Sequence, residues 1–268
     1  EAPLLTVACL KLGAMIVPLN FKLTAGEILP LLEDADCKIV VSQAKHLDRL
    51  ELAAAKLPFK VYSLDGNDVP GFASLCIDSG LAPTEVIGLT DAGFLCYTSG
   101  TTGRQKGALL THGSAMYPGL AKNIAEGLTW RDSIMVAVPF VFTGAIVSCF
   151  IQFTVNAGGT MVLESDFDID RYLDVIQRHR VSAATTVPVV WERLMRSPGF
   201  ERADLSSMIS AAAGGAPVSI DLIEAYRAKG ISLIQSYGLT EASGLAATMH
   251  GEDAIKHIGW AGRPIVGS

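Results

Sequence analysis

The second half of the chain alternates between two hydrophobic patterns. From residue 132 onward, short apolar runs are separated by segments in which apolar residues recur every three or four positions. The first pattern is typical of buried strands and the second of helices with one buried face. The expected strands span residues 134–138, 160–163, 181–187, 208–213 and 231–235, and the expected helices span 145–155, 169–179, 188 onward and 220–229. This order predicts an α/β fold with mostly parallel sheets flanked by helices.

Two of the helices carry end signals. Asp168 or Asp170 is expected to cap one helix and Ser219 another, because their side-chain oxygens can accept hydrogen bonds from the first free amides. Gly230 is expected to end the second of these helices. The first ninety residues show weaker patterns, with helices expected over 4–12 and 25–32, strands over 13–18 and 38–42, and a Gly-, Pro- and Asp-containing linker over 65–91.

Composition narrows the class of protein. Of the 268 residues, 50% are hydrophobic and 18% charged, which supports a folded core and excludes a disordered chain. The net charge of −6 has the wrong sign for binding nucleic acid. The five cysteines are widely spaced and lack a Cys-x-x-Cys pair, so we interpret them as buried thiols in a reducing compartment.

A long run without charged residues, from Ser133 to Leu163, raises the alternative of a membrane protein. Pro139, Gly144 and the pair Gly158-Gly159 interrupt the run, and no basic cluster flanks it. We therefore expect a buried strand, a loop, a buried helix and a second strand, with no transmembrane segment. Since Lys11 interrupts the apolar N-terminal stretch and no targeting signal is visible, we expect a cytoplasmic location.

The clearest candidate for a functional site is a loop of glycines and hydroxyl residues that follows an expected strand. The loop contains Thr98, Ser99, Gly100, Thr101, Thr102 and Gly103, and ends on Lys106 and Gly107. Glycines allow backbone N–H groups to turn toward an anion, hydroxyls add donors, and lysine supplies a cation. A flexible polar surface loop is the alternative. The spacing excludes the P-loop of nucleoside triphosphatases, in which the lysine follows the second glycine directly.

Two residues near the end of the last expected strand suit a nucleotide. Tyr237 follows the strand at its carboxyl end, where open α/β sheets bind ligands, and its ring can stack on a base. Glu241 offers a hard oxygen ligand for magnesium that also binds substrate phosphate. Taken alone, Tyr237 reads as a core or rim aromatic and Glu241 as a solvated acid at a helix start. We expect His112, near a helix start, to have a capping rather than a catalytic role.

The segment Tyr97 to Gly107 resembles the phosphate loop of the adenylate-forming (AMP-binding) superfamily, which includes the acyl-CoA synthetases. It departs from the family pattern at Gln105, where the family has proline. The segments 236–241 and 214–217 are similar to two later family motifs, and 11–20 is similar to the family's early segment. The resemblance covers the whole chain in the family's order.

The resemblance implies a role for each motif. Thr98 to Lys106 would hold the β and γ phosphates of ATP, and Glu241 with Thr102 would hold Mg2+. Tyr237 and Gly238 would lie against the adenine, Thr240 would contact the nucleotide phosphate, and Lys106, Thr240 and Glu241 would carry the chemistry. The turn of Gly214, Gly215, Ala216 and Pro217 would lie at the adenine and acyl pocket.

The same resemblance places the acid-binding segment at residues 139–144. The family's histidine falls on Phe142, which removes a titratable group, and Phe142, Thr143 and Gly144 would contact the acid together with Gly215. Because the run from Ser133 to Leu163 has no acidic residue to pair with a substrate ammonium, we expect an uncharged, apolar acid. Phe150 and Phe153 read as core residues of a buried helix.

The reaction implied is the activation of a carboxylic acid by ATP to an acyl-adenylate, followed by transfer to coenzyme A as in fatty acid metabolism. An aryl-acid ligase and a nucleotide-binding fragment without turnover are the alternatives. We expect residues 1–90 to be the start of the adenylation region, incomplete at its beginning, and residues 91–268 to be the nucleotide- and acyl-binding subdomain. We expect the family's ribose-binding Asp, hinge and C-terminal domain with its catalytic Lys to lie outside this chain; the sequence leaves the oligomeric state open.

Overall fold

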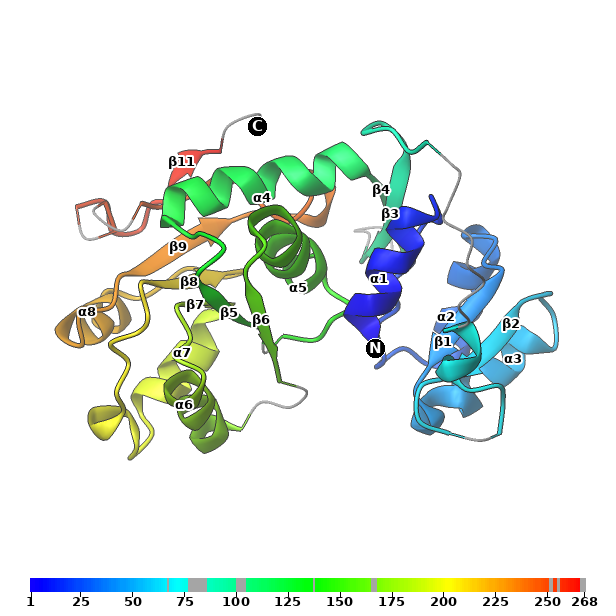
Figure 1. The fold of residues 1–268 in the computed structure, drawn as a ribbon, viewed down its shortest axis with the longest axis horizontal. Helices are drawn as coiled ribbons and strands as arrows, with labels where there is room; N and C mark the ends of the chain where they lie inside the picture. The colour runs from blue at the N-terminus through cyan, green and yellow to red at the C-terminus, as the bar shows by residue number, and fades with distance from the viewer. Residues whose placement is uncertain are drawn as a thin grey trace. The chain divides into compact units, whose positions relative to one another are not determined.

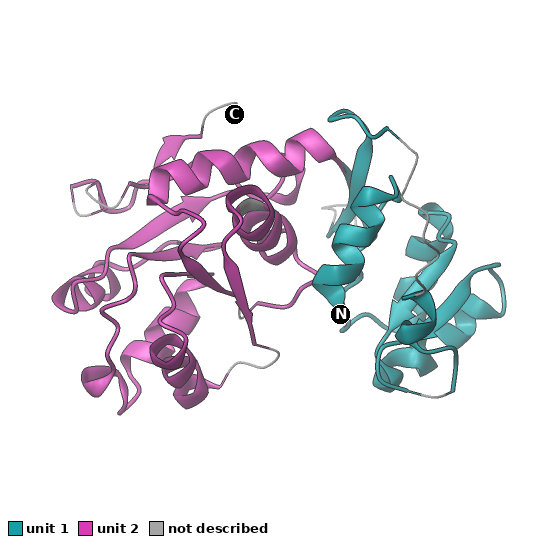
Figure 2. Ribbon diagram, in the orientation of Figure 1, with its two compact units in different colours: residues 1–109 teal, residues 110–268 magenta. Residues whose placement is uncertain are grey.

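The computed structural model shows two compact units, residues 1–109 and residues 110–268 (Figure 2). The structure describes residues 1–66, 68–76, 86–99, 105–136, 138–164, 168–250, 253–254 and 256–265. Among these residues, no helix is long and apolar enough to cross a membrane.

Unit 1 contains short helices and two small sheets. Its helices are α1 (Ala2–Lys11), α2 (Ala25–Asp34) and α3 (Glu51–Ala54), with 3-10 turns η1 (Ala44–Leu50) and η2 (Phe72–Leu75). Strands β1 (Ile39–Ser42) and β2 (Lys60–Ser63) pair in parallel, and β3 (Ala92–Thr98) pairs with β4 (Lys106–Thr111), which crosses the boundary between the units. A core around Ile28, Leu32, Leu50 and Ala53 holds α2 and α3 on the first sheet.

Unit 2 is built on a sheet with the strand order β11-β10-β9-β8-β7-β5-β6 within the described residues (Figure 1). The strands are β5 (Ser133–Val136), β6 (Thr160–Leu163), β7 (Ala183–Thr186), β8 (Ser210–Gly214), β9 (Leu233–Tyr237), β10 (Ala247–Thr248) and β11 (Arg263–Pro264). Strands β5 to β9 are parallel, and β10 and β11 add an antiparallel edge.

Helices cover both faces of this sheet. One face carries α4 (His112–Glu126), α5 (Thr143–Ala145) and the π-helix η3 (Ile146–Val155), and the other carries α6 (Ile169–Arg178), α7 (Pro188–Met195) and α8 (Ile220–Ala228) (Figure 1). Short turns η4 (Phe200–Arg202) and η5 (Thr240–Ala242) complete the unit. Each face of the sheet has its own hydrophobic core. On β7, Ala183 packs with η3 in one core, and its neighbour Ala184 packs with α6 to α8 in the other.

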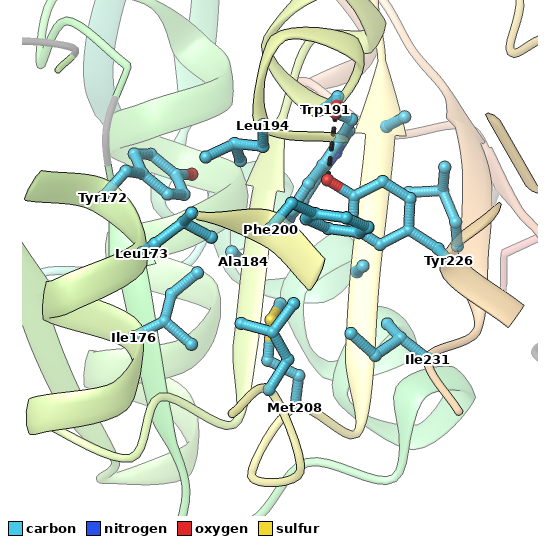
Figure 3. Packing of buried hydrophobic residues seen from close by; sticks show 14 of the residues in the cluster. Tyr172, Leu173, Ile176, Ala184, Trp191, Leu194, Phe200, Met208, Tyr226 and Ile231 are labelled. Carbon is cyan, nitrogen blue, oxygen red and sulfur yellow. Dashed lines mark hydrogen bonds between the residues drawn. The ribbon is translucent and has the colours of Figure 1, made fainter. Parts of the chain in front are cut away.

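The larger core lies between the sheet and α6, α7 and α8 (Figure 3). Trp191 is fully buried, its indole N–H donates to the Ala212 carbonyl at 3.0 Å, and its carbonyl accepts the Tyr226 hydroxyl at 3.0 Å. The rings of Phe200 and Tyr226 meet edge to face with centroids 5.1 Å apart. The aromatic side chains thus join α7 and α8 to the central strand β8.

The structure confirms the predicted alternation of strands and helices in unit 2. Asp168 caps α6, Ser219 caps α8, and Gly230 follows α8 with φ +78°. Phe150 and Phe153 are buried, as expected of core residues.

Two predictions for unit 1 were wrong. The strand expected over 13–18 is reduced to a single bridge between Ile16 and Phe94, because the helix before it extends to Lys11 and Gly13 takes φ +68°. Cys76 is exposed rather than buried, because it follows a 3-10 turn with no buried residue. Cys96 and Cys149 are buried, as predicted.

Candidate functional site

The loop of glycines and hydroxyls begins and ends on the paired strands β3 and β4. Thr98 closes β3, Lys106 opens β4, and the Thr98 hydroxyl lies 3.5 Å from the Lys106 carbonyl. Ser99 and Lys106 are exposed. Gly100, Thr101, Thr102 and Gly103 lie outside the described residues, so the structure shows only the two ends of the loop, and its role in binding phosphate stays a prediction.

Tyr97, which precedes the loop, is anchored to the end of α2. Its hydroxyl donates to Asp34 Oδ2 at 2.7 Å. Burial, followed by this bond to the carboxylate, raises the pKa of Tyr97. Gly107 leaves room for the Leu95 side chain, whose Cδ1 would lie 2.7 Å from a Cβ at residue 107. Tyr97 therefore anchors β3 to α2, and Gly107 allows β4 to pack closely on Leu95 of β3.

In unit 2 the sheet has a topological switch point between β5 and β7. The chain moves from β5 to β6 on one side and then returns to β7 on the other side of β5. Open α/β sheets bind ligands beyond the carboxyl ends of the strands at such a point. The carboxyl end of β5 leads to Phe142 and Thr143, and that of β7 leads to Val187. The predicted acid-binding segment thus begins at the expected binding edge.

One hydrogen bond and two close approaches of glycine backbone relate the strand ends at this edge. The Thr143 hydroxyl donates to the Thr240 hydroxyl at 3.3 Å. Gly215, at φ +83°, has space for a Cβ that would lie 3.7 Å from Val187 Cγ1. Across the next pair of strands, a Cβ at Gly214 would lie 3.4 Å from the Ser236 carbonyl oxygen. The loops after β5, β7, β8 and β9 therefore lie side by side.

The predicted nucleotide residues follow β8 and β9. Gly214 ends β8, and Gly215, Ala216 and Pro217 form an exposed turn before α8. Tyr237 ends β9 with 54% of its surface exposed, and Glu241 is exposed on η5. Gly238 is required for close packing, because a Cβ there would overlap the Gly244 carbonyl.

The acid-binding segment combines exposed and buried groups. Phe142 is 49% exposed and Gly144 faces open space, while Thr143 is buried. The sequence analysis missed Ser148, whose buried hydroxyl lies against Gly244 and has no hydrogen-bond partner among the described residues. The signal in the sequence that could have pointed to Ser148 was a polar residue inside the charge-free run from Ser133 to Leu163.

His112 opens α4, but it is Thr111 that caps the helix, accepting from the Ser114 N–H at 3.0 Å. His112 Nε2 is buried and makes no hydrogen bond to the described part of the chain. The capping role that we expected of His112 therefore belongs to its neighbour.

A family model for AMP-binding enzymes matches residues 1–268. The chain belongs to the AMP-binding enzyme family. It is 33% identical to a feruloyl-CoA synthase of an Amycolatopsis species over 260 residues, which are 96% of this chain and 50% of the relative. The chain thus spans about half the length of the curated relatives it matches.

Solved structures of the family have the same fold. The inhibitor-bound N-terminal domain of FACL13 from Mycobacterium tuberculosis superposes with a TM-score of 0.87 at 28% identity, covering 98% of this chain and 66% of that one. The O-succinylbenzoate coenzyme A synthetase of Bacillus subtilis, in complex with ATP and magnesium ion, gives 0.83 at 25% identity, covering 99% and 53%. The predicted fold class, that of the N-terminal domain of adenylate-forming enzymes, is confirmed.

Proposed function

We propose that this chain contributes the adenylation site of an AMP-forming acid–thiol ligase. A carboxylate oxygen of the acid attacks the α phosphorus of ATP, the bond from that phosphorus to the β-phosphate oxygen breaks, and pyrophosphate leaves. The sulfur of coenzyme A then attacks the acyl carbon, AMP leaves, and the thiol proton passes to solvent. Membership of the family and the shared edge of four strand ends support this proposal.

We propose one role for each motif. The loop from Thr98 through Ser99, Gly100, Thr101, Thr102 and Gly103 to Lys106 would hold the β and γ phosphates. Tyr237 and Gly238 with the turn 214–217 would hold the adenine, and Thr240 would orient a phosphate. Phe142, Thr143, Gly144 and Gly215 would receive the acid. Catalysis of this kind is mainly positioning and charge neutralisation, which exposed donors and a lysine can supply.

The oxygen atoms of the Glu241 carboxylate and the Thr102 hydroxyl are ligands of the kind that Mg2+ binds. No group of three or more His, Cys, Asp or Glu side chains converges anywhere in the described ranges. Mg2+ bound with nucleotides takes one or two protein oxygens and completes its shell with phosphate oxygens and water. The exposed Glu241 carboxylate suits that arrangement, in which the ion would neutralise phosphate charge.

The acid is proposed to be apolar, either a fatty acid or an aryl acid. Uncharged residues fill the segment from Ser133 to Leu163, and the rings of Phe140 and Phe150 meet edge to face with centroids 5.6 Å apart. The relatives include a feruloyl-CoA synthase and a long-chain-fatty-acid–CoA ligase, so both acid classes occur among similar proteins.

Acid-dependent exchange of pyrophosphate into ATP tests the proposal. The gene product that contains this chain is assayed with a panel of fatty and aryl acids. Lys106→Ala removes the loop cation and should raise the KM for ATP about tenfold or more, since a hydrogen bond to a charged group contributes about 1.5–3 kcal/mol. Lys45→Ala, also exposed in unit 1, is the control. Unchanged exchange in Lys106→Ala would contradict the role of Lys106, and no exchange with any acid would contradict the proposed function.

A further inference from the structure

One side chain of unit 1 links the strand before the glycine and hydroxyl loop to helix α2. Tyr97 stands next to Thr98, the last residue of β3. Its hydroxyl donates to Asp34 Oδ2 at 2.7 Å, and the Leu31 carbonyl oxygen lies at 3.3 Å. Because a tyrosine hydroxyl has a single proton, the shorter bond to the charged acceptor is the main one. Tyr97 therefore ties the end of β3 to Asp34, the last residue of α2.

The ring of Tyr97 also lies against β4. Leu95 and Tyr97 are two residues apart, so their side chains lie on the same face of β3. A Cβ at Gly107 would lie 2.7 Å from Leu95 Cδ1 and 3.4 Å from Tyr97 Cε1. The ring thus packs beside residue 107, directly after Lys106, with which β4 begins. Tyr97 therefore lies against both strands close to the points where the loop leaves β3 and joins β4.

The two strands need such support from outside. Two strands on their own are only marginally stable in water. Among the described residues, β3 and β4 form a sheet of two strands, to which Ile16 adds an isolated bridge at Phe94. The bond from Tyr97 to Asp34 adds a second attachment, three residues closer to the loop.

Helix stability does not account for the carboxylate at position 34. The C-terminal end of a helix carries a partial negative charge, so it favours basic rather than acidic side chains. The last turn of α2 has no basic residue, and Glu33 brings a second acid to it. Residues that conflict with their local structure are expected where a site imposes its own requirement. The bond from Tyr97 supplies such a requirement for Asp34.

We propose that Asp34 is a positioning residue, which holds Tyr97 and thereby sets where Thr98 and Lys106 place the two ends of the loop. Asp34 lies outside the segments that resemble the family motifs. The anchoring part of this inference concerns the fold of unit 1 alone. Its effect on ATP rests on the proposed function, in which the loop holds the β and γ phosphates.

Amide hydrogen exchange tests the anchoring directly. Tyr97→Phe keeps the ring and removes the hydroxyl, while Asp34→Ala removes the charged acceptor. We expect the amides of residues 97–98 and 106–107 to exchange at least fivefold faster in Tyr97→Phe and at least threefold faster in Asp34→Ala. The amides of β1, in the other sheet of unit 1, should stay within twofold of the wild type. Equal acceleration in β1, or no acceleration at the loop ends, would overturn the inference.

Two further variants show whether the bond itself is responsible. Because Tyr97 and Asp34 act through one bond, the double variant should match Tyr97→Phe within 1.5-fold. Glu33→Ala removes the neighbouring exposed acid of α2 and should leave exchange at the loop ends within 1.5-fold of the wild type. A double variant that multiplies the two single effects, or a Glu33→Ala variant that behaves like Asp34→Ala, would also overturn the anchoring.

Kinetics of the gene product test the effect on ATP. Asp34→Ala and Tyr97→Phe should each raise the KM for ATP at least threefold and leave the KM for the acid within 1.5-fold, whereas Glu33→Ala should change neither. A mere loss of folded protein would lower kcat and leave both KM values unchanged. No rise in the KM for ATP, or an equal rise in the two values, would refute the effect on the loop. If the wild type shows no acid-dependent exchange of pyrophosphate, the proposed function fails, and hydrogen exchange still decides the anchoring by Asp34.

Discussion

Replacing Lys122 by methionine should destabilise unit 2 severely. The change removes the ammonium that pairs with Glu126 from a site where both partners are 1% exposed, and within the described residues it leaves the Glu126 carboxylate with the hydrogen bond from the Ser210 hydroxyl. Breaking a buried pair in this way costs about 3–5 kcal/mol, because one charge stays buried without compensation. For a domain of this size, each 1 kcal/mol lowers the Tm by about 2–4 °C. We therefore expect a decrease in Tm of roughly 6–20 °C.

Tryptophan fluorescence measures this loss in unit 2 specifically. All three tryptophans, Trp130, Trp191 and Trp260, belong to residues 110–268. Trp191 is fully buried, so its emission shifts to longer wavelength when the core between the sheet and α7 opens. Unfolding in urea, followed by this shift, gives the free energy of unfolding from the midpoint and slope.

The controls separate the effect of burying the ion pair from the effect of its i,i+4 spacing. Arg178 and Asp174 form an exposed pair with the same i,i+4 spacing on α6, and Arg178→Met should cost at most about 1 kcal/mol. Adding Glu126→Gln to Lys122→Met removes the unpaired charge and should recover more than half of the loss. A loss for Lys122→Met no larger than that for Arg178→Met would refute the argument from burial. A double variant as unstable as the single one would assign the loss to packing instead.

Three further changes probe other contacts. Tyr226→Phe removes the hydrogen bond to the Trp191 carbonyl and should lower the free energy of unfolding of unit 2, measured in urea, by about 0.5–1.5 kcal/mol. A decrease below about 0.3 kcal/mol would contradict this. Gly244→Ala should lower the Tm, because residue 244 has φ +90° and its Cβ would meet the Ser148 hydroxyl; adding Ser148→Ala should recover only part. Glu27→Gln should lower the Tm at pH 7, because the backbone and hydroxyl hydrogen bonds from Thr24 lower the pKa of Glu27. This stabilisation is present above pH 4.5 and is lost as the pH falls through the lowered pKa. A difference in Tm between wild type and variant that stays the same at every pH would refute this reasoning.

Most of unit 2 could be predicted from the sequence because local signals agree with the fold there. Asp168 and Ser219 provide caps, the face of Ile169, Leu173 and Ile176 gives helical spacing, and β-rich runs mark the parallel strands. Strands β10 and β11 were missed because each has only two residues, too few for a period to show. The π-helix was missed because its apolar run fits any buried helix.

The residues of the candidate site were predicted from motifs, but the contacts between these residues were not predicted. The motifs give Tyr237, Thr240 and Thr143 as separate positions, while the bond from Thr143 to Thr240 depends on the sheet order. Lys122 carries no warning in the sequence, since a lysine on a helix is usually solvated. Its burial follows from small residues on the facing strands, Ala183 and Ala212, which only the register of β7 and β8 brings beneath α4.

The two edges of the large sheet differ in how they can meet another chain. At one edge, β11 ends on Pro264, which has no N–H to donate, and the strand is only two residues long. At the other edge, β6 pairs within the described residues with β5 alone, and its four residues Thr160–Leu163 include the half-exposed Leu163. Within the described residues, β6 therefore offers the longer stretch of unpaired backbone to a strand of another molecule.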